Sequence, residues 1–117
     1  MKKLILGLAA LVFAAQSLFA AQSLFADAAA DTGQRIYLKA LSEQTGLNGA
    51  DFAAQHTIEE WKKLFEDGGK GFIDEIGAKF PKTREYLNGE SFAKHLPYLG
   101  AFMIEYAKYS GNFPSCN

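Results

Sequence analysis

Apolar side chains recur along this sequence at steps of three and four residues, which is the spacing of one face of an α-helix. The pattern is present in segment 36–41 and is strongest in segments 58–65 and 99–109. No segment alternates apolar and polar residues in the way that a half-buried β-strand does. The pattern therefore predicts a small all-α domain.

Two kinds of residue predict where these helices begin: those whose side chains cap a helix N-terminus, and proline, whose missing N–H is tolerated in the first turn. Thr57 and Glu60 form a capping-box sequence, in which the side chain of each residue accepts the backbone N–H of the other. Asp31 or Thr32 can cap the first helix. We expect Pro97 in the first turn of the last helix, because the N–H that proline lacks has no partner there.

Glycine readily adopts the left-handed conformation found at helix C-termini, so glycines predict where the helices end. Gly46 is expected to end the first helix, and Gly68 with Gly69 the helix that starts at the capping box. A further short helix is expected before Pro81, since proline interrupts helices. Gly111 is expected to end the last helix.

The first 26 residues have the pattern of a secretory signal peptide. Lys2 and Lys3 precede an apolar run over 4–15, and the first acidic residue is Asp27. A basic start, an apolar run of about a dozen residues and a small-residue exit are typical of signals that are removed on export.

The end of this signal is less sharply marked. The hexamer AQSLFA occurs twice in succession, and small residues allow cleavage anywhere between positions 20 and 30. Polar residues interrupt the apolar stretch before it reaches the length of about 20 residues that a membrane span needs. We therefore expect cleavage rather than an uncleaved anchor, which leaves a periplasmic domain over 27–117 without membrane attachment.

Charge and cysteine content narrow the partners of this domain. Without the two signal lysines it has 10 basic against 13 acidic side chains, a net charge of −3. A mildly acidic balance argues against nucleic acid as a partner. Cys116 is the only cysteine, so no disulfide forms within the chain, but two chains can be linked through it in an oxidising compartment. A solvated tail thiol is the alternative.

The sequence contains no set of residues that is typical of an enzyme. Cysteine and histidine are too few for a zinc site, and residues 68–71 lack the spacing of a phosphate-binding loop. Adjacent acidic residues such as Glu59 and Glu60 are expected on solvated helix faces. We therefore expect a binding protein rather than an enzyme.

Residues 33–40, with the sequence GQRIYLKA, resemble the N-terminal helix of class I cytochromes c. The last helix, with Met103 and Tyr106, is similar to the helix that crosses it in that family. The resemblance implies a small cytochrome c-like helical domain, in which Gly33 and Tyr37 meet Met103 and Tyr106 where the N- and C-terminal helices cross. Glycine at a crossing lets two backbones approach closely.

The haem-attachment motif of that family is absent. In cytochromes c a C-x-x-C-H motif follows the aromatic residue, and its places are held here by Leu41, Gln44 and Thr45. Without two thiols and the adjoining histidine, no haem can be attached covalently. The side chains expected to fill the volume of the missing haem are Trp61, Phe65, Phe72 and Phe80.

Two histidines are the candidate ligands for a haem held without covalent bonds. A neutral imidazole is a good ligand for iron, so His56 and His95 would clamp a porphyrin if they faced each other. The alternative places His56 in a hydrogen bond at a corner between helices and His95 on the surface. Met103 is expected in the core rather than as a ligand.

Segments 46–61 and 106–116 also resemble a group of short exported bacterial proteins classed as cytochrome c-like, a resemblance that implies no particular activity. The expected function is a periplasmic binding or accessory module without covalent haem, associated with a redox or electron-transfer system and a protein partner. The alternative is an electron carrier whose non-covalent haem is held by His56 and His95.

Overall fold

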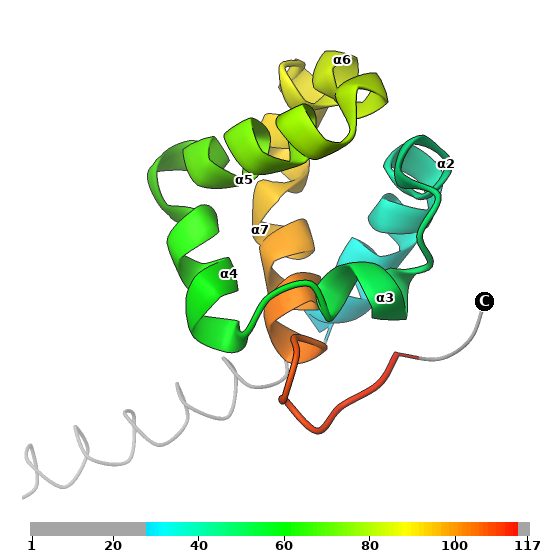
Figure 1. Cartoon of the computed structure of the whole chain (residues 1–117), viewed down its shortest axis with the longest axis vertical. Coiled ribbons are helices and arrows are strands. Elements are labelled where there is room, and N and C mark those ends of the chain that lie inside the picture. The colour runs from blue at the N-terminus through cyan, green and yellow to red at the C-terminus, as the bar shows by residue number, and fades with distance from the viewer. Residues whose placement is uncertain (1–27, 115–117) are drawn as a thin grey trace, which may run out of the picture.

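The computed structural model describes residues 28–114, and every regular element in this range is helical (Figure 1). The N-terminal helix covers residues 28–40. It is followed by α2 (Ser42–Thr45), α3 (Gly49–Ala53), α4 (Ile58–Leu64), α5 (Glu66–Lys79), a 3₁₀ turn (Pro81–Thr83), α6 (Arg84–Leu87) and α7 (Glu90–Glu105). The expected all-α fold is confirmed.

Two sequence predictions fall outside the described residues. These are the signal peptide over 1–26 and the pairing of Cys116. Within 28–114, no helix has both the length and the apolar character that a bilayer crossing requires.

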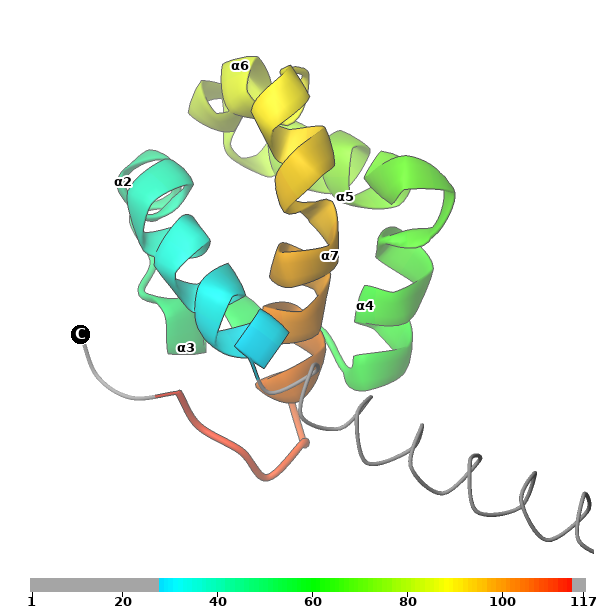
Figure 2. The same ribbon diagram turned by 180° about the vertical axis from the view of Figure 1, so that it is seen from behind.

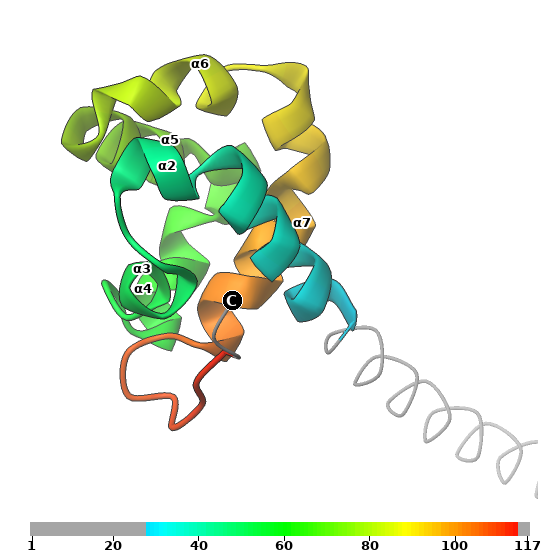
Figure 3. The same ribbon diagram turned by 90° about the vertical axis from the view of Figure 1, so that its right-hand side faces the viewer.

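The N-terminal helix and α7 cross at close range (Figures 2 and 3). A Cβ atom on Gly33 would lie 2.7 Å from the carbonyl carbon of Tyr98 and 2.8 Å from Cβ of Phe102. No side chain fits at these distances, so the crossing requires glycine. The ring of Tyr37, one turn further along, lies 6.1 Å from the ring of Phe102.

The other two residues that the resemblance places at the crossing are Met103 and Tyr106. Met103 is completely buried in the core. The ring of Tyr106 lies 5.5 Å from that of Phe102, just beyond the last residue of α7. The atoms nearest to Gly33, however, belong to Tyr98 and Phe102, which are one turn earlier on α7.

The capping box at the start of α4 is confirmed. The Thr57 hydroxyl accepts the N–H of Glu60 at 3.3 Å, and the Glu60 carboxylate accepts the N–H of Thr57 at 2.9 Å. The backbone hydrogen bond from Thr57 is the main reason that the pKa of Glu60 is lowered. Gly46 adopts the left-handed conformation with φ of 71°, but it ends the short α2, because the first helix already stops at residue 40.

Two expected helix starts are wrong. The N-terminal helix continues without a break through Asp31 and Thr32. Pro97 lies inside α7, well after its first turn. A proline inside a helix costs about 3 kcal/mol, but the turns before Pro97 bury Phe92, whose ring stacks on Phe72 at 5.7 Å. Burial of these turns against the core offsets the missing hydrogen bond.

The last helix also ends earlier than expected. It stops at Glu105 rather than near Gly111, and residues 106–114, hereafter the C-terminal segment, continue without regular structure. The N–H of Lys108 donates to the carbonyl of His56 at 2.9 Å. This bond to a distant part of the chain replaces the helical hydrogen bonds that would have continued α7.

A left-handed turn near the start of α5 separates Glu66 from the regular helix over 70–79. Asp67, Gly68 and Gly69 have φ angles of 52°, 69° and 78°. Gly69 is also closely packed, because a Cβ there would lie 2.7 Å from Cδ1 of Leu96, whose side chain would have to move. The two glycines therefore mark the break between the helices, although α4 itself ends earlier, at Leu64.

The core consists largely of aromatic rings. Trp61 is completely buried, and its Nε1 donates to the carbonyl of Ala53 at 2.7 Å. Its ring lies 6.1 Å from that of Phe65 and 6.0 Å from that of Phe72, and these two rings stack at 4.7 Å. Phe80 packs against the edge of the same core. Side chains therefore fill the volume beside Trp61.

Candidate functional site

His56 lies at the corner between α3 and α4 and is held by two carboxylates. Its Nε2 lies 2.5 Å from Oε2 of Glu75 on α5, and its Nδ1 lies 3.6 Å from Oε1 of Glu60 on α4. The ring meets that of Trp61 edge-on, with 4.8 Å between centroids. Through its carbonyl His56 also accepts the N–H of Lys108. His56 therefore connects α4, α5 and the C-terminal segment.

His95, on α7, has a different partner. Its Nδ1 lies 2.7 Å from the hydroxyl of Tyr86 on α6, and burial raises the pKa of Tyr86 to about 12. The ring of Trp61, which contacts His56, lies 6.0 Å from that of Phe72 in a tilted arrangement. Phe72 in turn stacks on Phe92 at 5.7 Å, and Phe92 meets Tyr86 edge-on. The two imidazoles are therefore engaged by different partners, which favours the hydrogen-bonded alternative over a haem clamped between them.

The described part of the chain also lacks a cluster of metal ligands. Among residues 28–114, no group of three or more His, Cys, Asp and Glu side chains is arranged to hold a metal ion.

A groove of 570 Å³ lies between α3 and the C-terminal segment. Figures 1 and 3 show this segment leaving the end of α7 and passing beneath α3. Three of the lining residues, Ala50, Ala54 and Ala107, have small side chains that leave the space open. The other lining residues are Asp51, Tyr106, Lys108, Tyr109, Gly111, Asn112, Phe113 and Pro114.

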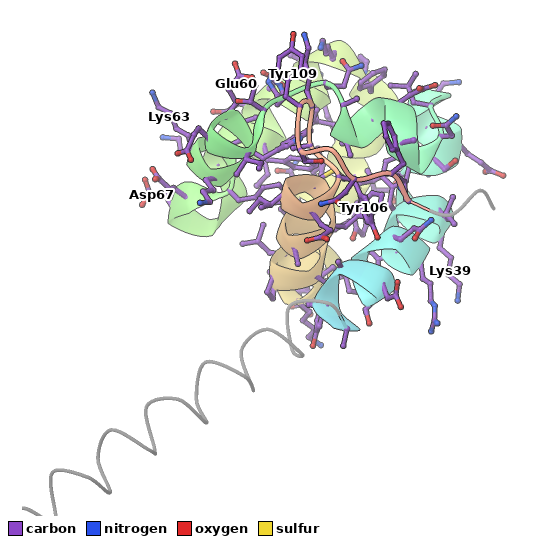
Figure 4. The ribbon with its side chains drawn as sticks, turned by 90° about the horizontal axis from the view of Figure 1, so that it is seen from below. Lys39, Glu60, Lys63, Asp67, Tyr106 and Tyr109 are labelled. Atoms are coloured by element: carbon purple, nitrogen blue, oxygen red, sulfur yellow. The ribbon has the colours of Figure 1, made fainter. Side chains whose placement is uncertain are left out.

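Two aromatic residues of this groove are unusually exposed. Tyr109 and Phe113 are 85% and 86% exposed, and they are the exposed large hydrophobic residues of the described chain. Tyr109 also has a φ of 65°, a left-handed conformation that costs a bulky residue about 1–2 kcal/mol. Figure 4 shows Tyr109 on the outer bend of the C-terminal segment. Exposed apolar side chains and backbone strain at one place are typical of a recognition surface.

Hydrogen bonds hold the C-terminal segment in position. The bond from Lys108 to His56 ties it to the corner between α3 and α4. The Nδ2 of Asn112 donates to the carbonyl of Glu105 at 3.3 Å, which ties it to the last residue of α7. One wall of the groove is therefore fixed to two separate helical corners.

The groove has one acidic and one basic side chain, on opposite walls. Asp51 belongs to α3 and Lys108 to the C-terminal segment. Asp51 makes no ion pair with any other residue between 28 and 114. The ammonium group of Lys108 lies over the ring of Tyr109, 5.0 Å from its centroid. Such a contact is worth about 0.5–1 kcal/mol at an exposed site.

Neither Tyr109 nor Phe113 is predicted as a site residue from the sequence. The helical spacing places Tyr109 on the core face of the last helix, but α7 ends at Glu105, and the ring is exposed instead. Phe113 lies between Gly111 and Pro114, in a stretch whose composition predicts a turn. A large apolar residue inside such a turn is the one sequence signal that points to this surface.

Comparison of the chain with models of protein families, with characterised proteins and with solved structures found no match. The likeness to cytochromes c therefore rests on the residues named above. The assignment of function rests on the geometry of the groove.

Proposed function

We propose that this protein is an exported, cytochrome c-like accessory module that lacks covalent haem and binds a segment of another protein chain in the groove between α3 and the C-terminal segment. The main support is the combination of a space lined by alanines with two exposed aromatic rings beside it. Folding leaves this apolar surface in contact with water, whereas binding would cover it. Aromatic residues are enriched at protein interfaces.

The chemistry of the groove favours a segment with large apolar side chains. Ala50, Ala54 and Ala107 leave room for them, and their burial is worth about 25 cal/mol per Å² of apolar surface. The residues that line the groove include no histidine, serine or cysteine, and most of them are small or apolar. We therefore assign the groove to binding rather than to catalysis.

The setting that we propose is the periplasm, beside a redox or electron-transfer system. The signal-like pattern of residues 1–26 and the cytochrome c-like sequence of residues 33–40 support it. The alternative, an electron carrier with a non-covalent haem, has less support, because His56 and His95 are bonded to separate partners.

Photo-crosslinking in the periplasm tests this proposal. A photoreactive phenylalanine analogue replaces Tyr109 in one variant and Lys39 in the matched control. Lys39 is exposed on the N-terminal helix and lies away from Tyr109 in Figure 4. We expect crosslinks to a protein chain at position 109 and none at position 39.

A second control blocks the groove itself. Ala54 is exposed, so Ala54→Arg fills the space with a long side chain without disturbing the core. We expect this substitution to abolish the crosslinks formed at Tyr109. Crosslinks of equal yield at positions 109 and 39, or crosslinks that survive Ala54→Arg, would contradict the proposal.

A further inference from the structure

The groove offers both an open space and exposed aromatic rings. Tyr109 and Phe113 belong to the lining of the groove, yet they are 85% and 86% exposed. In a twofold dimer the same patch of each copy forms the contact. If one residue of the first copy touches a different residue of the second, the same two residues also touch with the copies exchanged. The rings of one copy can therefore enter the groove of the other, while the rings of the second copy enter the groove of the first.

The two charges of the groove fit the same symmetry. Asp51 lies on one wall and Lys108 on the other. A partner with charges of a single sign would place like charges together at one of these positions, which costs binding energy. A twofold axis allows Asp51 of each copy to lie opposite Lys108 of the other. The contact then has two ion pairs, and both charges of each copy are paired.

We propose that the occupant of the groove is a second copy of this chain, bound in a twofold contact in which Asp51 of each copy pairs with Lys108 of the other. This inference rests on the proposed function, because it names the partner of the same groove. The contact covers Tyr109 and Phe113, the rings that folding leaves exposed. It is non-covalent and does not require Cys116.

Charge exchange in a Cys116→Ser background tests the contact, because this background cannot form disulfide-linked dimers. The mass of the secreted protein is measured by light scattering over a range of concentrations. We expect the Cys116→Ser protein to dimerise. Asp51→Lys and Lys108→Asp should each raise the dissociation constant about tenfold or more, since each puts like charges together twice. The control, Lys39→Asp, makes the same charge change away from the groove and should leave the constant unchanged.

A mixture of two variants gives the most specific result. The Asp51→Lys protein has two basic residues in its groove, and the Lys108→Asp protein has two acidic ones. Each should dimerise at least about tenfold more weakly alone than the Cys116→Ser protein does, and the two should form a heterodimer when mixed. The double variant, with both exchanges in one chain, should dimerise again. Circular dichroism of every variant checks that the helices are retained.

The outcomes separate this inference from the proposed function. A Cys116→Ser protein that is still monomeric at about 1 mM, or a mixture that forms no heterodimer, overturns the second-copy inference. The proposed function still stands if crosslinks at position 109 join this chain to a different protein and are abolished by Ala54→Arg. If no groove-dependent crosslink of either kind forms, both fail.

Discussion

Two sets of aromatic side chains in this molecule have opposite environments. The interior set consists of Phe52, Trp61, Phe72 and Phe92. Its residues are at most 2% exposed, and successive ring centroids lie 5.7–6.0 Å apart. The groove set, Tyr109 and Phe113, is 85% and 86% exposed. The interior rings come from the helices that surround the core, whereas the groove rings come from the chain beyond the last helix.

This difference shows that a high aromatic content does not measure the size of a core. The interior rings lose their contact with water when the chain folds, so they stabilise the folded monomer. The groove rings keep that contact until a partner binds. Substitutions in the interior set should therefore lower the free energy of unfolding, and substitutions in the groove set should weaken association.

The largest effect is expected at Trp61. Trp61→Ala should lower the free energy of unfolding by about 3–5 kcal/mol, since it leaves a cavity among three rings and an unpaired carbonyl on Ala53. Phe113→Ala, in the groove set, should change it by less than about 0.5 kcal/mol. Urea denaturation followed by circular dichroism measures both. Losses of similar size would erase the distinction between the two sets.

The next effect concerns the helix crossing that holds the interior together. Gly33→Ala should lower the free energy of unfolding by about 2–3 kcal/mol, because its Cβ would lie 2.8 Å from Cβ of Phe102. The matched control is Gly77→Ala in α5, where the new Cβ makes ordinary contacts with the side chains of Arg84 at 3.4 Å and Leu87 at 3.9 Å. The control should be neutral or gain up to about 1 kcal/mol in helix propensity. Equal melting temperatures for both variants would argue against a tight crossing.

A pH dependence distinguishes the buried phenol of Tyr37 from exposed ones. Burial raises the pKa of Tyr37 to about 12, while its hydroxyl donates to the carbonyl of Leu47 at 2.7 Å. An unfolded tyrosine loses its proton near pH 10, so between pH 10 and 12 the folded chain binds more protons. The free energy of unfolding should therefore be constant below pH 10 and fall by about 1–2 kcal/mol as the pH rises to 12.

Removing the hydroxyl tests this origin. Tyr37→Phe should flatten the dependence on alkaline pH, even though it lowers stability at neutral pH through the lost bonds to Leu47 and Thr45. Unfolding in urea at a series of pH values measures the slope. An unchanged slope in the variant would assign the effect to other groups, such as Tyr86, whose pKa burial also raises to about 12.

The smallest effect is expected at Tyr109, where one substitution should stabilise the folded monomer and weaken the dimer. Tyr109→Gly should raise the free energy of unfolding by about 1 kcal/mol, since glycine adopts a φ of 65° without strain. The same variant should dimerise more weakly, because a groove ring is lost. Phe113→Ala should weaken the dimer without stabilising the monomer. A less stable Tyr109→Gly protein would mean that this ring supports the fold.

Local signals in the sequence predict the local features of the fold. The capping box at Thr57, the left-handed end at Gly46 and the break at Gly68 and Gly69 each depend on a few neighbouring residues. Their hydrogen bonds and backbone angles need no tertiary contact. Such features can therefore be recognised along the chain before the packing is known.

Features that depend on packing are predicted less well. Pro97 is tolerated inside α7 because Phe92 is buried against the core, and nothing next to the proline in the sequence reveals that. The groove escapes prediction for a similar reason, since α3 and the C-terminal segment are far apart in the chain. The apolar spacing that includes Tyr109 cannot show that the helix has already ended.

The contact of Gly33 with α7 also sets the earliest moment at which the domain can fold. The surface that covers the first helix is the last helix of the described chain, so a partly synthesised polypeptide has nothing to place there. At about 5–20 residues per second, a ribosome needs several seconds to add the intervening stretch. During that interval the face of the first helix that α7 later covers stays exposed to solvent.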